Sequence, residues 1–375
     1  MPTVVVFLSL HRLIITKGRR QIRGISNIWS VSHNSAVECI PPTITLFYSI
    51  TMYFNVIFYT EEIKKVLLFI KNDHEYYMNR PENKILQYYA VQGSKIGFYY
   101  VGYLYITCIA YVLLPTVSLV IDEIVSSNHS EGKSFPVVLD YGVDMEQYFY
   151  HLFIPVYASM LMIANAVASY DNTYMLHVQH TSALFAIVSY KLRTLLDSLI
   201  NLKNDRLIKK YNIELSLADK EEIFKKLMLC IKEHQNAIEC ADLVESLFSK
   251  SILVVQCCSV ITLTIGGVET VLNLDDADYV MRFGGLALSQ VIHIFVLCLP
   301  GQRLLNHSEE VHAAACEMMW YILPENCLNL YKFLLARTMV FNKITAFKLA
   351  VMSMETFQTI IQTAMSYFTV LLSLI

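Results

Sequence analysis

Charged residues are scarce in this chain of 375 residues. Asp, Glu, Lys and Arg make up 16% of it, against about 25% in an ordinary soluble domain. Hydrophobic residues make up 55%, and the mean hydropathy is +0.44. A water-soluble fold of this size would expose far more polar surface. The net charge of −3 gives no sign of nucleic-acid binding. The composition therefore indicates a membrane protein.

Glycine and proline are also sparse, with 12 and 9 residues, whereas Tyr and Phe number 24 and 19. Few helix breakers and many aromatic residues are typical of membrane helices, whose rings line cavities or sit at interfaces. The apolar runs are long and continuous rather than alternating, which excludes a β-barrel. We therefore expect an all-α, polytopic transmembrane helical bundle.

Motifs of catalysis and metal binding are missing. The sequence holds no GxSxG, HExxH, Walker A or GxGxxG pattern, and none of its nine cysteines pairs at CxxC spacing. Most cysteines lie in or beside apolar segments, where cysteine acts as a small hydrophobe. His177 and His180 lie three residues apart without a third ligand, so we expect polar packing there rather than a metal site. No enzyme activity, cofactor or metal is expected.

Six apolar segments are long enough to cross a bilayer, which takes about 20 residues per helix. They lie at about 42–60, 96–121, 148–170, 247–272, 283–305 and 349–375. Two acidic residues, Asp171 and Glu269, fall near the ends of these segments, where solvation at the interface is the ordinary explanation.

Lys and Arg collect in alternate connections. Segment 61–95 carries six, 181–235 carries ten and 306–348 carries four, whereas 122–147 carries one beside six acids and 271–280 carries none. Basic loops stay in the cytoplasm. The acidic connections are therefore predicted outside, and the C-terminus ends extracellularly. Asn128 begins an Asn-His-Ser sequon in a predicted external loop and is a candidate glycosylation site.

The N-terminal residues 1–35 break this pattern, because the basic stretch 17–23 would lie outside. We expect that a first span is missing or divergent here, and that 36–375 forms the transmembrane domain of a seven-span parent. Segments at about 181–240 and 306–348 show helical apolar spacing with charges between. We expect cytoplasmic helical extensions there that pack together; amphipathic lids on the membrane surface are the alternative.

Short motifs follow one another in the last part of the chain. They are Gly301-Gln302, Ser308, Val311, Trp320-Tyr321, Arg337, Ile344-Thr345-Ala346, Lys348, Ser353-Met354-Glu355-Thr356-Phe357 and Ser366-Tyr367-Phe368-Thr369-Val370-Leu371. Further matches are Glu38-Cys39-Ile40-Pro41-Pro42, His180, Leu184-Phe185 and Tyr190-Lys191-Leu192. In this order the set resembles the insect odorant receptor family, particularly the receptors of bees, wasps and ants, over roughly 36–375. Departures are Cys316, Phe341 and Phe347, where Tyr, Pro and Gly are common in the family.

This resemblance implies a seven-helix subunit with an internal N-terminus, in the plasma membrane of olfactory sensory neurons. It implies that the chain assembles with an odorant co-receptor subunit into a hetero-tetrameric, ligand-gated cation channel within membrane lipid. The last helix would line the pore with Val370, Ser373 and Leu374, and a ring of Val and Leu can gate by dewetting. Of the motif residues, we single out Trp320, Tyr321, Ser366, Tyr367 and Phe368.

A volatile small-molecule ligand is expected in an apolar pocket within the outer halves of the helices. Aromatic walls would bury it, while Tyr or Thr hydroxyls would orient it. Candidates are Phe47, Tyr48, Thr107, Tyr111, Phe153, Tyr157 and Phe283.

Three other classes are weighed against this one. A gustatory-type chemoreceptor channel is the closest, and the context of Ser366 to Leu371 favours an odorant receptor. A G-protein-coupled receptor has the reverse orientation, and the sequence lacks DRY and NPxxY motifs. A secondary transporter would show internal repeats and interrupted helices, and neither is found.

Overall fold

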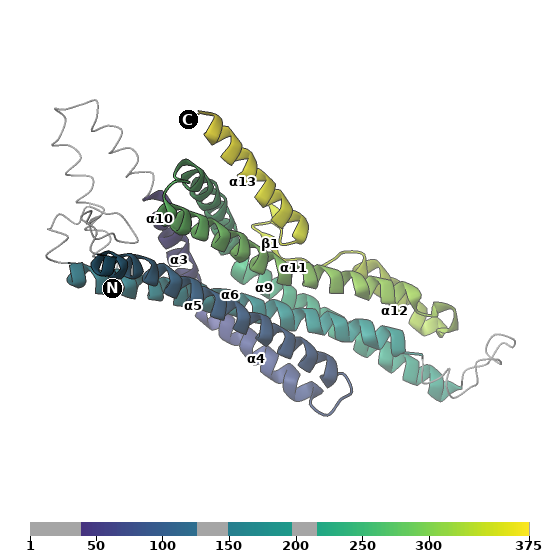
Figure 1. Ribbon diagram of the computed structural model, residues 1–375. Helices are drawn as coiled ribbons and strands as arrows, with labels where there is room; N and C mark the ends of the chain where they lie inside the picture. Colours follow the sequence, from purple (N-terminus) through teal and green to yellow (C-terminus); the bar gives the residue numbers. More distant parts are fainter. Residues whose placement is uncertain (1–38, 126–148, 197–215, 375) are drawn as a thin grey trace.

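Long helices running side by side make up most of the protein (Figure 1). The computed structural model describes residues 39–125, 149–196 and 216–374. The long helices are α3 (Ile40–Phe58), α4 (Thr60–Tyr77), α5 (Asn83–Val125), α6 (Phe149–Thr194), α9 (Leu217–Leu272), α11 (Gly285–Glu317), α12 (Glu325–Thr338) and α13 (Met354–Leu374). The short elements are α10 (Ala277–Tyr279), η1 (Val280–Gly284), η2 (Trp320–Ile322), β1 (Thr345–Ala346) and β2 (Ala350–Val351). The all-α prediction is confirmed.

Local sequence explains where several helices begin. Prolines stand in the first turn of α3, where a missing N–H costs nothing. The longest helix, α9, starts with a capping box in which the Asp219 N–H donates to Ser216 Oγ at 3.1 Å. The Ser216 N–H donates in return to Asp219 Oδ2 at 3.2 Å.

Three helices among the described residues are long and apolar enough to cross a membrane. They are α9, the continuous helix formed by η1 and α11, and α13. The other predicted segments, at 42–60, 96–121 and 148–170, fall largely within α3, α5 and α6. The last segment was predicted to begin at 349, but the helix begins at Met354 because 350–351 pair as a β-strand.

The core lies where α6 packs against α5, α9 and α11. Tyr170 and Tyr174 of α6 meet Phe248 of α9 edge to face, with ring centroids 5.5 and 5.4 Å apart. All three side chains are fully buried. Such rings each bury a large area, so this contact fixes α6 against α9 near the middle of both helices.

A buried ion cluster joins three elements at the end of the bundle predicted to be cytoplasmic. Lys191 Nζ of α6 lies 2.6 Å from Glu233 Oε1 of α9 and 3.2 Å from Glu82 Oε1, in the turn before α5. Burial alone would lower the pKa of Lys191, but its two glutamate partners outweigh burial and raise that pKa. The amphipathic helix ends expected here therefore pack through paired charges as well as through apolar residues.

A small hairpin, β1 with β2, connects α12 to α13. Its turn holds Phe347 and Lys348 at φ 50° and 59°, the left-handed region that favours glycine. The Phe347 N–H donates to the carbonyl oxygen and to Oγ of Ser249 at 3.1 and 2.8 Å, and the Thr345 hydroxyl donates to Glu245. The hairpin is thus fixed to α9. The predicted extension at 306–348 is helical over α11 and α12 but not over this hairpin.

Candidate functional site

A cluster of polar side chains lies buried between α3, α5, α6 and α11. Asp171 of α6 is 1% exposed, and its Oδ2 accepts from the Tyr100 hydroxyl at 2.5 Å. His293 Nε2 lies 3.2 Å from the same oxygen. The His293 ring also stacks on Tyr48 at 6.0 Å, and the Tyr48 hydroxyl accepts from Gln290 Nε2 at 2.9 Å. Three helices therefore meet at one buried carboxylate, and α3 joins them through Tyr48.

Two polar atoms of this cluster, Gln290 Oε1 and His293 Nδ1, are buried and have no hydrogen-bond partner. An unsatisfied buried polar atom costs about 1–3 kcal/mol. Because a small molecule carrying a donor would recover that cost at Gln290, this position suits the recognition of one polar group within apolar surroundings.

Aromatic residues gather at the predicted outer end of the same helices. Tyr157 of α6 is buried and lies within electrostatic range of Arg282 and Tyr111. Arg282 and Phe283 are also buried, and Phe283 stacks with Tyr279 at 6.0 Å. Arg282 and Phe283 lie on η1, a π-helical turn, and such turns are frequent at functional sites. Aromatic rings therefore lie beside a buried cation at this end of the helices.

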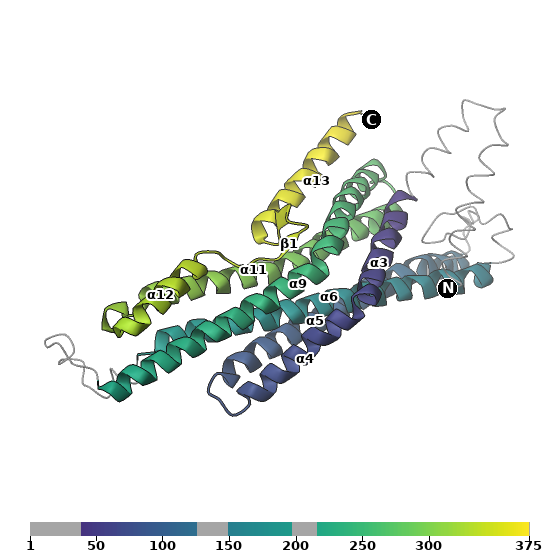
Figure 2. The ribbon, with the colours of Figure 1, turned by 180° about the vertical axis from the view of Figure 1, so that it is seen from behind.

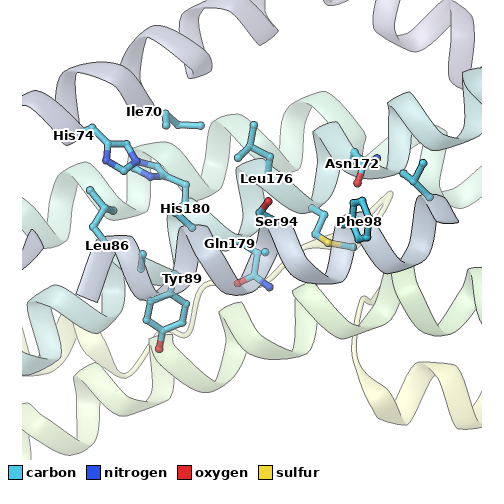
Figure 3. Close-up of a pocket in the computed structure, with 16 residues that line it drawn as sticks. Ile70, His74, Leu86, Tyr89, Ser94, Phe98, Asn172, Leu176, Gln179 and His180 are labelled. Carbon is cyan, nitrogen blue, oxygen red and sulfur yellow. The ribbon is translucent and has the colours of Figure 1, made fainter. Parts of the chain in front are cut away.

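A groove of about 440 Å³ runs between α5 and α6, with α4 at one end. Figure 3 shows His74 and His180 at this end and Phe98 with Asn172 at the other. His180 Nε2 lies 2.8 Å from Asp73 Oδ2, so its polar packing has a specific partner. No group of three or more possible metal ligands occurs within the described ranges.

The last helix stands apart from the bundle (Figures 1 and 2). Only Ala364 of α13 is buried, and the helix packs on α9 and α11. Val370 and Leu374 are 54% and 77% exposed, and Ser373 is exposed as well. An apolar helix with so few buried residues presents most of its surface to lipid or to another protein chain.

The motif residues before α13 hold it to α11. A Cβ atom at Gly301 would collide with the backbone oxygen of Met352, so only glycine permits this approach. Gln302 Oε1 accepts from the Met354 N–H at 3.0 Å, and Ser308 Oγ accepts from the Asn342 N–H at 2.8 Å. Direct contacts therefore join α11 to the start of α13 and to the segment before it.

The family model described as 7tm Odorant receptor matches residues 32–365. The chain belongs to the insect odorant receptor family. This membership favours an odorant receptor over the gustatory, G-protein-coupled and transporter alternatives, and makes the chain a multi-pass membrane protein of a sensory, non-enzymatic family.

Solved structures agree on the fold. Olfactory receptor OR5 from Machilis hrabei in complex with eugenol superposes with a TM-score of 0.64 and 13% identity, over 91% of this chain and 82% of that one. The same receptor in a second structure gives 0.63 and 12%, over 91% and 81%. At this identity the likeness shows the shared fold alone. Curated protein sequences give no match.

The odorant receptor brings some of the predicted pocket residues together and not others. Tyr48 lies in the central cluster, and Tyr111, Tyr157 and Phe283 lie near Arg282 at the outer end. Phe47 is 58% exposed and belongs to neither group. The Thr107 hydroxyl donates to the Leu104 carbonyl of its own helix. The side chain of Phe153 and all of Asn128 lie outside the described residues.

The motif residues singled out from the sequence lie mostly on the surface of the odorant receptor. Trp320 and Tyr321 are 53% and 69% exposed and meet edge to face. Tyr367 is 58% exposed, whereas Phe368 packs beside Gly267 of α9. The Ser366 hydroxyl donates to the Gln362 carbonyl, one turn back along α13.

Two expectations about charge are wrong. Asp171 and Glu269, assigned to solvated span ends, are 1% and 8% exposed. Asp171 is held by Tyr100 and His293, and Glu269 Oε2 accepts from Asn273. Sequence reasoning also missed Gln290, His293 and Arg282. The signal was present, because ionisable and polar residues inside or beside a span mark functional positions.

Proposed function

We propose that this odorant receptor is the ligand-sensing subunit of a heteromeric cation channel in the plasma membrane of olfactory sensory neurons. An odorant co-receptor subunit would complete the hetero-tetramer, as the family resemblance implies. The C-terminus would be extracellular, as the distribution of Lys and Arg predicts.

One observation carries this proposal: only 6% of the most apolar stretch of α13 is buried against the rest of the chain. Burial of apolar surface drives association in water, but in lipid a helix gains by close packing or by lining a water-filled path. Val370, Ser373 and Leu374 lie on the exposed part of α13. Placed around a shared axis, they would supply an apolar constriction with one polar hydroxyl, which suits gating by dewetting.

The ligand would bind between the central polar cluster and the outer aromatic residues. Tyr157 and Phe283 would bury its apolar body, and Gln290 with Tyr48 would orient one polar group. Eugenol, bound by the Machilis receptor of the same fold, is a small aromatic molecule with a hydroxyl group. A ligand opens the pore only if it binds the open state more tightly, and the contact between α11 and α13 gives it a route.

The test is ligand-evoked current in cells that express this chain together with the co-receptor. We expect a cation current with some members of a broad odorant panel, and no evoked current when Gln290→Trp fills the proposed ligand site of this chain. Surface delivery without any evoked current would contradict the proposal. A C-terminal epitope tag should be labelled on intact cells; labelling that requires permeabilisation would overturn the orientation.

A further inference from the structure

The groove between α5 and α6 shares no lining residue with the proposed ligand site. Its floor is a strip of small residues on α5, Ala90, Gly93 and Gly97. A Cβ atom at Gly93 would lie 3.3 Å from Gln179 Cγ, and one at Gly97 would lie 2.6 Å from Asn172 Oδ1. Glycine at both positions therefore leaves room for the Gln179 and Asn172 side chains of α6.

One polar side chain in the groove is unsatisfied. Gln179 of α6 is 3% exposed, and neither its amide oxygen nor its amide nitrogen has a hydrogen-bond partner. Figure 3 shows its amide among the lining residues, midway between His180 and Phe98. A buried amide without partners costs free energy. A hydroxyl group both donates and accepts, so one hydroxyl would satisfy both atoms, whereas an ester carbonyl would satisfy only the nitrogen.

The charge and exposure of the lining residues restrict which class of molecule fits the groove. The residues lining the groove include no Lys or Arg, so nothing there would hold a phosphate headgroup. Phe98 at the apolar end is 75% exposed. The groove crosses the predicted inner boundary of the membrane: Gly97 and Phe98 lie in the segment predicted to span it at 96–121, whereas Ala90 and Gly93 lie in the connection predicted to be cytoplasmic. The open side of the groove therefore adjoins lipid at the Phe98 end. The volume of about 440 Å³ is in the range of small-molecule sites.

We propose that this groove binds a membrane sterol. The flat face of the fused rings lies along α5 beside Gly97, and the single hydroxyl pairs with the amide of Gln179. The sterol body extends from Gln179 toward Phe98. This site is separate from the odorant pocket, so its occupancy acts on the packing of α5 against α6 rather than on odorant contacts.

The test uses the full chain, purified with its co-receptor and reconstituted in phosphatidylcholine vesicles with a photoreactive sterol. Mass spectrometry is expected to find the label on α5 and α6 peptides, and unlabelled sterol should compete. Two variants should weaken labelling: Gln179→Leu by about tenfold, through loss of two hydrogen bonds, and Ala90→Trp by filling the groove from its exposed wall. A sterol methyl ether, which cannot donate, should compete less well than the parent sterol.

Gln256→Leu is the matched control. Gln256 of α9 is also a buried glutamine with neither amide atom partnered, but it does not line the groove. This change should leave labelling unaltered while removing the same unpaired amide.

Four results would overturn the proposal. They are equal labelling of wild type and Gln179→Leu, a label confined to other helices, equal labelling of the groove by photoreactive phosphatidylcholine, or a cross-link showing residues 1–38 in the groove. None of these results bears on odorant-evoked current, so failure of the sterol site and failure of the proposed function are distinguishable.

Discussion

Removing the buried cation Lys191 should destabilise the end of the bundle predicted to be cytoplasmic. Its side chain is 11% exposed, and those of Glu233 and Glu82 are 7% and 11% exposed. Each glutamate also keeps one buried oxygen without a hydrogen-bond partner. Lys191→Met would therefore leave two buried carboxylates unpaired. Breaking a buried ion pair in this way costs roughly 3–5 kcal/mol.

Thermal unfolding of the purified receptor measures this effect. A loss of 3–5 kcal/mol should lower the midpoint by roughly 5 °C in a chain of this size. Lys71→Met is the control, because Lys71 and Glu75 form an exposed pair, 70% and 66% exposed, at 3.8 Å; it should melt like wild type. The triple change Glu82→Gln, Lys191→Met, Glu233→Gln should recover most of the loss, since replacing all the charges together is nearly neutral. A single variant that melts like wild type, or a triple variant that melts like the single one, would refute this reasoning.

Two further predictions concern the same half of the molecule. Burial, reinforced by the positive charge of Arg337, lowers the pKa of His234 to about 4. The unfolded chain therefore binds a proton below pH 6.5 that the folded chain does not, and stability should fall by about 3 kcal/mol between pH 6.5 and 4. His234→Leu should flatten that part of the pH profile in thermal melts, and an unchanged profile would contradict the assignment. At Phe347, where φ is 50° and the side chain is 54% exposed, Phe347→Gly should raise the unfolding free energy by about 1 kcal/mol, because a left-handed non-glycine residue is strained; a lower melting midpoint would count against strain at this turn.

Hydropathy predicted the positions of the long helices because a bilayer requires about 20 apolar residues in each span. Hydropathy alone did not show how far they continue, but the helical apolar spacing over about 181–240 predicted extensions beyond the spans. The helix α9 begins at Leu217, far before the predicted segment at 247–272. The pairing of Glu233 with Lys191 of α6 could not be predicted, because the two residues are distant in the sequence and no local pattern reveals a partner.

The candidate site shows the same limit. Tyr48 and Tyr157 were identifiable because aromatic residues in the outer halves of spans suit a small-molecule pocket. Asp171 was placed at a solvated span end because its position along the chain suggested one, whereas its partners Tyr100 and His293 come from two other helices. The hairpin of β1 and β2 was also missed, since strands of two residues are too short to show an alternating pattern. The departure of Phe347 from a common glycine was its only trace.

The pore assignment of α13 is tested most directly by thiol accessibility in the assembled channel. The Ser373→Cys variant is expressed with the co-receptor. The resulting channel is opened by an odorant while a charged, membrane-impermeant thiol reagent is applied outside. We expect irreversible loss of the evoked cation current in this variant, and no loss in wild type or in Leu372→Cys, which lies on another face of the helix. If the reagent modifies the introduced thiol and the current persists undiminished, α13 does not line the ion path.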